Sequence, residues 1–284
     1  MARQNTDISV FARYVTKALI YFFLCSWAFT TLYLLFWVVN NSFKTSALVF
    51  SDSFSLAKSF DVSNYITAFS RLNIGRAYFN SIFISCCVVI GVIVFGGMSA
   101  YIMARYEFRM KKLIHAILVS SLLFPVYCTI VPVFEMLFKM KLINNYFGVI
   151  LPQTAGNMAF AIIVLTSFMK TIPIEMEEAA YVEGYSTWQI FVKIILPLSK
   201  SSFATVGIFT FLWSYNDLFT SLIILRDPTY FPISNLLNEI SSKYGTDYGL
   251  MAASVTLVII PVLIVYLIGQ KQIVKGLTAG AVKG

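Results

Sequence analysis

Charged residues open one short stretch between two apolar segments, residues 177–197, with the sequence EEAAYVEGYSTWQIFVKIILP. The stretch is polar and acidic at its front, contains one glycine, and ends in an apolar run closed by proline. A piece of this length has too little apolar surface to fold alone, because short isolated helices are marginal in water. We therefore expect this stretch to dock into another surface.

Proline and glutamate mark the start of a helix in this stretch. Pro173 stands where a helix can begin, because the N–H that proline lacks is not needed in the first turn. Glu175, Glu177 and Glu178 follow, and their charge suits the positive end of the helix dipole. The pattern predicts a first helix that runs to about Val182.

A glycine separates this helix from a second one. Gly184 supplies a turn without a side-chain penalty. Ser186 or Thr187 is predicted to cap a second helix over residues 188–196. Pro197 then marks the passage into the next apolar segment.

Two carboxylates lie inside apolar segments, Glu135 and Asp217. An ionisable group within a membrane span is costly and is therefore a hypothesis for a functional site. In one interpretation Asp217 reaches interfacial water or is capped by neighbouring polar groups; in the other it lines a cavity with Tyr215 and Asn216. Together with Trp213, these residues are our candidates for the wall of a solute pathway.

Cysteine and histidine do not form a metal-binding pattern. Cys25, Cys86, Cys87 and Cys128 all lie in apolar runs, and none has a metal-like spacing to the single His115. We expect small buried hydrophobic residues here, with no disulfide framework and no metal site.

Nucleotide-binding and catalytic signatures are also absent from the sequence. It contains no G-x-x-x-x-G-K-[ST], G-x-S-x-G, H-E-x-x-H or G-x-G-x-x-G. We therefore expect neither a cofactor nor enzymatic activity in this chain. Transporters driven by an ion gradient usually hold the ion with buried carboxylates, histidines or broken helices, and the two peripheral acids Glu135 and Asp217 do not suit this role. Energy for uphill transport would therefore come from a separate subunit.

Composition places the chain in a lipid bilayer. Of its 284 residues 58% are hydrophobic and 12% charged, and the mean hydropathy is +0.79, whereas a soluble domain carries about 25% charged residues. The predicted fold is all-α with six transmembrane helices. They are expected at 18–40, 78–104, 115–138, 148–169, 202–224 and 248–268.

Three prolines fall inside these segments, Pro125 and Pro132 in the third and Pro261 in the sixth. Proline removes a helix hydrogen bond, so kinks are expected at these positions. A role of the kinks in gating is one possibility.

Basic residues set the predicted orientation. The net charge of +8 comes from Lys and Arg that flank the apolar segments, which favours topology over nucleic-acid binding. The two tails and the loops 105–114 and 170–201 hold 13 Lys and Arg, against 8 in the other three connections. Both termini are therefore predicted to be cytoplasmic.

Three parts follow from this topology: a tail over 1–17, a transmembrane domain over 18–268 that includes the 170–201 loop, and a tail over 269–284. The first apolar segment is longer than the core of a signal peptide and lacks a clear cleavage site, so we expect it to be retained.

Two loops on the predicted outer side have helical patterns. Residues 61–72 place apolar side chains at helical spacing after Asp61. Residues 225–247 suggest a short helix through Leu236, Leu237 and Ile240. Each helix either lies on the membrane interface or docks an external partner.

The 177–197 stretch resembles a known motif. Its pattern is E-A-A, three residues, G, nine residues, I-x-L-P, and it matches the cytoplasmic loop of permease subunits of binding-protein-dependent ABC importers. The seven matching positions are Glu178, Ala179, Ala180, Gly184, Ile194, Leu196 and Pro197.

This resemblance implies the type I permease fold of ABC importers, with the loop as a coupling helix seated in a cytoplasmic ATPase. Glu178 would offer a charge to a basic partner residue, Ala179 and Ala180 would allow close approach, and Gly184 would permit the bend. The alternative is an amphipathic loop helix that packs against the chain's own spans.

The C-terminal sequence QKQIVKGLTAGAVKG, residues 270–284, resembles that of carbohydrate-uptake permeases of the maltose/maltodextrin type. The stretches FNSIFIS, FPVYCTIVPVFEMLF, INNYFGVILPQTA and TDYGLMAASVTLVIIPVLIVYL agree with this subfamily. The resemblance implies a flexible tail that contacts the ATPase; the alternative is a frayed basic tail. The residues concerned are Gly276, Leu277, Thr278, Ala279, Gly280 and Lys283.

The family implies an assembly in a bacterial cytoplasmic membrane. This chain would be one of two permease subunits. Two ABC ATPases that bind ATP and Mg would join them, and an extracytoplasmic binding protein would deliver a sugar, with an oligosaccharide as the expected form. One alternative is an ABC permease for a peptide, an amino acid or a phosphate ester. Another is a secondary transporter or channel.

Overall fold

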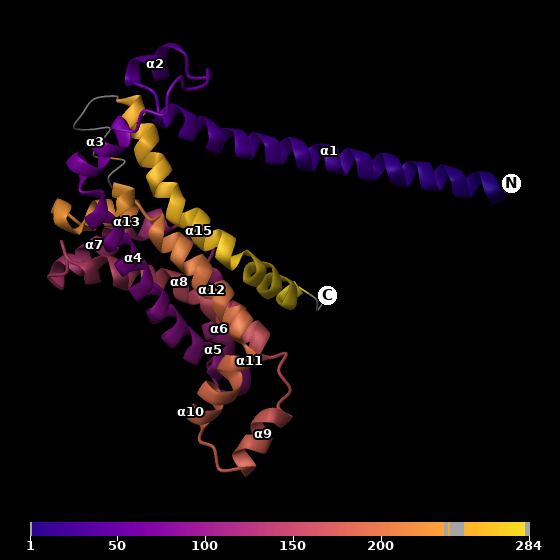
Figure 1. Cartoon of the computed structure of the whole chain (residues 1–284). Helices are drawn as coiled ribbons and strands as arrows, with labels where there is room; N and C mark the ends of the chain where they lie inside the picture. The colour runs from indigo at the N-terminus through magenta and orange to yellow at the C-terminus, as the bar shows by residue number, and fades with distance from the viewer. Residues whose placement is uncertain (1, 236–237, 239–246, 282–284) are drawn as a thin grey trace. The chain divides into compact units, whose positions relative to one another are not determined.

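A computed structural model describes residues 2–235, 238 and 247–281 (Figure 1). Every regular element within these residues is a helix, as the composition and the apolar segments predict. The chain divides into two compact units, one of residues 1–71 with 240–257 and the other of residues 72–239 with 258–284. The second unit holds the candidate site.

The first unit begins with a single long helix. It contains α1 (Ala2–Ser42), α2 (Ser46–Ser51), α3 (Ser63–Leu72) and the first turns of α15 (Tyr248–Ala281). Residues Arg13–Ser42 of α1 are apolar and long enough to cross a membrane. The helix predicted within 61–72 is confirmed as α3, and Asp61 accepts a hydrogen bond from the Ser63 backbone N–H at 2.9 Å.

The connection after α1 is held by polar contacts. Asn40 donates to the Ser55 carbonyl at 2.8 Å. Lys44 is buried, and its Nζ donates to the carbonyls of Asp52 and Ser55 at 3.0 and 2.6 Å. A buried ammonium is costly unless its protons are bonded, so these carbonyls fix the path of the chain.

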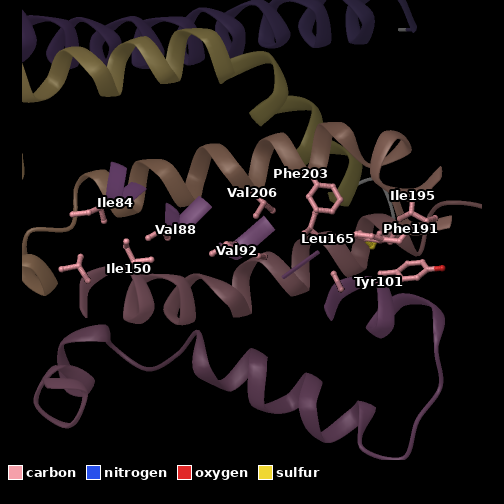
Figure 2. Close-up of a cluster of buried hydrophobic side chains, with 14 of the residues drawn as sticks. Ile84, Val88, Val92, Tyr101, Ile150, Leu165, Phe191, Ile195, Phe203 and Val206 are labelled. Carbon is pink, nitrogen blue, oxygen red and sulfur yellow. The ribbon is translucent and has the colours of Figure 1, made fainter. Parts of the chain in front are cut away.

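The second unit is built around three packed helical segments. The first is continuous from Ile74 to Arg105, and consists of α4 (Ile74–Gly91), the π-helix η1 (Val92–Gly96) and α5 (Gly97–Arg105). It packs against α8 (Tyr146–Met169) and α12 (Lys200–Tyr215). Figure 2 shows the apolar side chains that fill the space between these helices. Lipid tails are as apolar as these side chains, so close van der Waals packing between the helices provides the stabilisation here.

A glycine permits the closest approach in this core. A Cβ at Gly97 would lie 2.7 Å from Cε1 of Phe203, which is shorter than a van der Waals contact. Phe203 is itself buried on α12. The missing side chain at Gly97 therefore lets α12 pack directly on the backbone of α5.

The third predicted span, 115–138, is not one helix. The structure has α6 (Lys111–Ser121), the 3₁₀ turn η2 (Val126–Thr129) and α7 (Ile130–Lys139). Pro125 precedes the turn in an extended conformation, with φ −62° and ψ 129°. A kinked helix was predicted at this proline, but the helix is interrupted there. Pro132 lies in the first turn of α7, where the lack of an N–H costs little.

The fifth predicted span, 202–224, is also divided. α12 ends at Tyr215, and α13 (Phe219–Ile224) follows after a short break that contains Asp217. The prediction that Asp217 lies inside a continuous helix was therefore wrong. At this break the Asp217 side chain accepts hydrogen bonds from the Thr220 backbone N–H and the Gln153 side chain, and the Ser214 hydroxyl donates to Gln153.

Four described helices are long and apolar enough to cross a membrane, and a fifth is counted if a bent pair is one span. The fourth of these is Tyr248–Ile273 within α15, and Pro261 lies inside this helix without dividing it. The bent pair joins residues Thr187–Leu198 to α12 at an angle of 81°. Six separate spans are thus not seen as six continuous helices in the described part.

Candidate functional site

We call residues 175–198 the EAA segment, after Glu178–Ala180. Its first helix is α9 (Glu175–Val182), with Ile174 as the N-cap. Pro173 therefore lies just before the helix, whereas it was predicted in the first turn. Three glutamates occupy the first turn, where they complement the positive end of the helix dipole. The prediction of a helix that ends at about Val182 is confirmed.

The elbow of the EAA segment depends on a left-handed residue. Gly184 has φ 85°, a conformation that costs other residues about 1 to 2 kcal/mol. Its N–H donates to the Tyr181 carbonyl, and the next N–H, of Tyr185, donates to the Ala180 carbonyl, both at 3.0 Å. These bonds satisfy carbonyls at the end of α9 that lack a helical partner.

A capping box starts the second half of the segment. Ser186 accepts from the Gln189 N–H at 3.4 Å, and the Gln189 side chain accepts from the Ser186 N–H at 2.8 Å. Of the two predicted caps, Ser186 is therefore the one used. The helix then runs through α10 (Thr187–Ile190), the π-helix η3 (Phe191–Ile195) and α11 (Leu196–Leu198).

Glu177 attaches α9 to the end of α5. This carboxylate is 2% exposed, accepts from the Tyr101 hydroxyl at 2.8 Å, and forms an ion pair with Nε of Arg105. Arg105 also donates to the Ile172 carbonyl at 2.9 Å, just before the segment. A buried charge requires partners of this kind, so α9 and the span that ends at Arg105 are tied together.

Apolar contacts reinforce this attachment. Ala180, Ile190 and Ile195 are buried in the same core cluster as the spans. The ring of Phe191 lies 5.4 Å from that of Tyr101, centre to centre, which joins η3 to α5 (Figure 2). The EAA segment therefore shares the core of the unit.

The seven motif residues divide between two faces. Ala180 is buried and Ile194 half-buried, whereas the other five are exposed: Glu178, Ala179, Gly184, Leu196 and Pro197. The small side chain of Ala180 thus serves packing inside the chain, and the prediction that it faces a partner was wrong. Ala179 is exposed as predicted.

Large apolar side chains extend the exposed face. Val182 is 89% exposed, and Met176 and Trp188 are also exposed. Around them, the Tyr181 hydroxyl lies 3.3 Å from that of Tyr106 and 3.1 Å from Oγ1 of Thr187. An uncovered apolar face on a charged elbow is typical of an interaction site.

The four pathway candidates do not gather on one surface. Trp213 packs against the rings of Phe160 and Phe209, with centre distances of 4.8 and 5.6 Å. Tyr215 is 1% exposed, whereas Asn216 is exposed and donates to the Leu212 carbonyl of its own helix.

Asp217 has a structural set of partners. Its Oδ2 accepts from Nε2 of Gln153 at 2.8 Å, and its Oδ1 accepts from the Thr220 N–H at 3.1 Å, in the first turn of α13. The Ser214 hydroxyl donates to the other side of the Gln153 amide at 2.6 Å. Of the two predicted alternatives, capping by neighbouring polar groups is the one that these contacts support.

Several residues of the predicted sites lie partly or wholly outside the described residues. Residues 276–281 continue α15 as helical backbone, whereas a flexible peptide was predicted, and their side chains lie outside the described residues, as does all of Lys283. Leu236, Leu237 and Ile240 also lie outside them. Within the described part, no three His, Cys, Asp or Glu side chains are placed to hold a metal ion.

Residues 92–279 match the family of binding-protein-dependent transport system inner membrane components, and the chain belongs to this family. It is 31% identical over 256 residues to the diacetylchitobiose uptake system permease protein NgcG of Streptomyces coelicolor, over 89% of this chain and 85% of the relative. It is also 31% identical to the trehalose transport system permease protein SugB of Mycobacterium tuberculosis, over 87% and 91% of the two chains.

A solved structure supports the fold. The chain superimposes with a TM-score of 0.80, at 23% identity, on a chain of a bacterial ABC transporter involved in the import of the acidic polysaccharide alginate. The superposition covers 90% of this chain and 96% of that one. The protein thus has the type I permease fold of ABC importers and is a multi-pass component of the inner membrane. The resemblance seen in the EAA motif is confirmed at the level of the family.

Proposed function

We propose that this chain is a permease subunit of an ATP-driven, binding-protein-dependent importer of an oligosaccharide, and forms half of the translocation pathway. The family is a transport component. Relatives named for diacetylchitobiose, trehalose and arabinooligosaccharide transport support a sugar as the solute. In this proposal the chain crosses the membrane six times, with α6–α7 and α12–α13 as broken spans, and both termini are cytoplasmic.

The two faces of the EAA segment carry the proposal. One face is fastened to the spans through Glu177 and Ala180, while the other presents Glu178, Ala179 and Val182 to a partner. A partner that grips the exposed face would therefore move the 74–105 span through the Arg105–Glu177 ion pair. In this way the EAA segment would transmit the movement of an ATPase to the membrane spans.

The energy source in this proposal is a pair of separate ABC ATPases, which bind ATP and Mg. Closure of the ATPases on ATP would draw the EAA segment with them and open the spans outward, and hydrolysis would reset them. The C-terminal residues Gly276–Gly280 and Lys283 would add contacts to the ATPases. A second permease subunit would complete the pathway, and an extracytoplasmic binding protein would deliver the sugar.

The proposal is tested with the complex that co-purifies with this chain from membranes. Reconstituted in liposomes with its binding protein, it is expected to take up oligosaccharide only with ATP. Uptake by this chain alone, without ATP, would contradict the proposal in favour of a secondary transporter. A cognate binding protein that prefers peptides or phosphate esters in thermal-shift assays would overturn the assignment of a sugar alone.

A further inference from the structure

A basic pocket lies where three helices of the second unit meet: the end of α5, the start of α6 and the end of α8. Its volume is about 380 Å³, and its lining includes Glu107, Lys111, Lys112, His115 and Lys170. Three lysines against one glutamate give this lining a net positive charge. The EAA motif and the pathway candidates contribute no residue to it, so the pocket is unused in the proposed transport function.

The pocket lies at the level of lipid headgroups. The span 74–105 ends at Arg105 and the span 146–169 ends at Met169. Residues from both ends line the pocket, Met103 and Glu107 from the first and Thr166 and Lys170 from the second. The two spans therefore end side by side, and the charged residues just beyond them fall at the membrane surface.

Two of the three lysines form no ion pair within the described part of the chain. Nζ of Lys111 is engaged, since it donates to the Tyr106 carbonyl at 3.0 Å and to Glu107 at 2.6 Å. Within the described part of the chain, no carboxylate lies within 4.0 Å of the amino groups of Lys112 and Lys170. Lys112 and Lys170 line the same pocket as Lys111, so their charges add there. The bond from Lys111, and then the charges of Lys111, Lys170 and Lys112, lower the pKa of the exposed Glu107.

An apolar strip continues from the pocket along α6. No side chain of α6 is buried. On the face that carries Lys112 and His115, the residues one and two turns further on are Val119 and Leu122, both exposed. A soluble anion would make no favourable contact with this apolar strip, whereas the acyl chain of a lipid would pack along it.

We propose that this pocket binds the phosphate of an anionic phospholipid, with Lys112 and Lys170 as its cationic contacts and His115 as a further hydrogen-bond donor. Cationic pockets between membrane helices at the headgroup level are suited to such lipids. Charge-assisted bonds to phosphate are among the stronger hydrogen bonds in proteins. The acyl chains lie against Val119 and Leu122.

The test counts lipids bound to the purified complex by native mass spectrometry, with phosphatidylglycerol and phosphatidylcholine as probes. Wild-type protein is expected to retain phosphatidylglycerol in preference to phosphatidylcholine. The variant Lys112→Gln/Lys170→Gln should bind phosphatidylglycerol about thirtyfold more weakly, because it removes two lysines that each act on an anionic headgroup. Lys112→Arg/Lys170→Arg should restore binding.

A matched control removes the same charge elsewhere. Lys58→Gln/Lys139→Gln changes two exposed lysines outside the pocket and is expected to bind phosphatidylglycerol like wild type. Equal binding by wild type, the pocket variant and this control would overturn the proposal. Displacement of the lipid by millimolar inorganic phosphate or glycerol 3-phosphate would assign the pocket to a soluble phosphate and overturn the lipid assignment.

Discussion

Glu177 and Asp217 are both carboxylates next to apolar helices, but their partners differ in charge. Glu177 is buried and pairs with the guanidinium of Arg105 and the hydroxyl of Tyr101. Asp217 is half-buried and accepts from the neutral amide of Gln153 and one backbone N–H. The first joins the EAA segment to a span, and the second joins α12 and α13 to α8.

This difference decides how firmly each joint is held. When one member of a buried ion pair is removed, the other is left as an uncompensated charge. When a neutral partner is removed next to a half-buried carboxylate, water can replace it. The joint that holds the EAA segment is therefore the costlier one to break, whereas the joint at Asp217 tolerates change.

The largest expected effect is at Glu177. Glu177→Gln leaves Arg105 buried without a counter-charge, because the Arg105 side chain is only 9% exposed. We expect a loss of about 3 to 5 kcal/mol in the free energy of unfolding, and a loss of ATP-driven uptake. Thermal unfolding of the purified complex and uptake in liposomes measure the two effects.

Two controls sharpen this prediction. Glu178→Gln changes the exposed neighbour and should alter the unfolding free energy by less than about 0.5 kcal/mol. The double variant Arg105→Met/Glu177→Met removes both charges and should recover most of the stability. Equal destabilisation by Glu177→Gln and Glu178→Gln would show that the ion pair does not hold the segment.

Asp217 is expected to have the next largest effect. Asp217→Ala removes the cap of α13 and leaves the Gln153 amide without its acceptor, which should cost about 1 to 3 kcal/mol. Asp217→Asn keeps an acceptor and should cost less. Denaturant unfolding measures both, with Asn216→Ala as a control on the exposed neighbour.

Uptake distinguishes the two interpretations of Asp217. With a structural role, activity should follow stability, so that Asp217→Asn transports almost like wild type. If Asp217→Asn is stable but has lost uptake, Asp217 contacts the solute and our structural interpretation of this joint is wrong.

Variants of Gly184 test whether the bend of the EAA segment matters as much as the ion pair of Glu177 with Arg105. Gly184→Val forces a β-branched residue to a positive φ and should cost about 1 to 2 kcal/mol. No atom lies within 4 Å of the site that a Cβ would occupy, so the effect comes from the backbone and not from a clash. Gly184→Ala should cost less. Unchanged uptake with Gly184→Val would exclude a role of the bend in coupling.

The sequence predicted the parts of the EAA segment that local chemistry determines. Pro173, Gly184 and Ser186 act through their own backbone or the next few residues, so helix start, elbow and cap could be predicted. Glu177 pairs with Arg105 across 72 residues of sequence, and nothing in the order of residues shows that contact. The sequence showed only the two ends of this contact separately, as an acidic helix start and a basic loop at 105–114.

Hydropathy predicted where apolar segments lie, but not where they break. Residues 115–138 and 202–224 are apolar enough for continuous spans. In the first, Pro125 adopts an extended conformation before the η2 turn. In the second, the bonds of Asp217 to Gln153 and Thr220 favour a break over a continued helix. The proline was visible in the sequence, whereas the partner of Asp217 lies on another helix.

The smallest expected effect is at the exposed ion pair of Glu107 and Lys111, which is the counterpart of the buried pair of Glu177 and Arg105. Glu107 is 88% exposed, and its hydrogen bond from Lys111 lowers its pKa. A lowered pKa in the folded state stabilises the protein at pH values above the pKa of the unfolded state, about 4.3. This contribution is lost as the pH falls through the folded-state pKa.

We therefore expect Glu107→Gln to lower the unfolding temperature only slightly at pH 7, because exposed ion pairs are weak and screened by salt. The difference from wild type should shrink in 1 M salt and vanish as the pH falls below the folded-state pKa. Glu183→Gln removes the same charge at an exposed carboxylate that forms no ion pair within the described residues, and is the control for loss of charge alone. If Glu107→Gln destabilised the complex as much as Glu177→Gln, burial would not be what makes the Glu177 joint strong, and the contrast between the two pairs would fail.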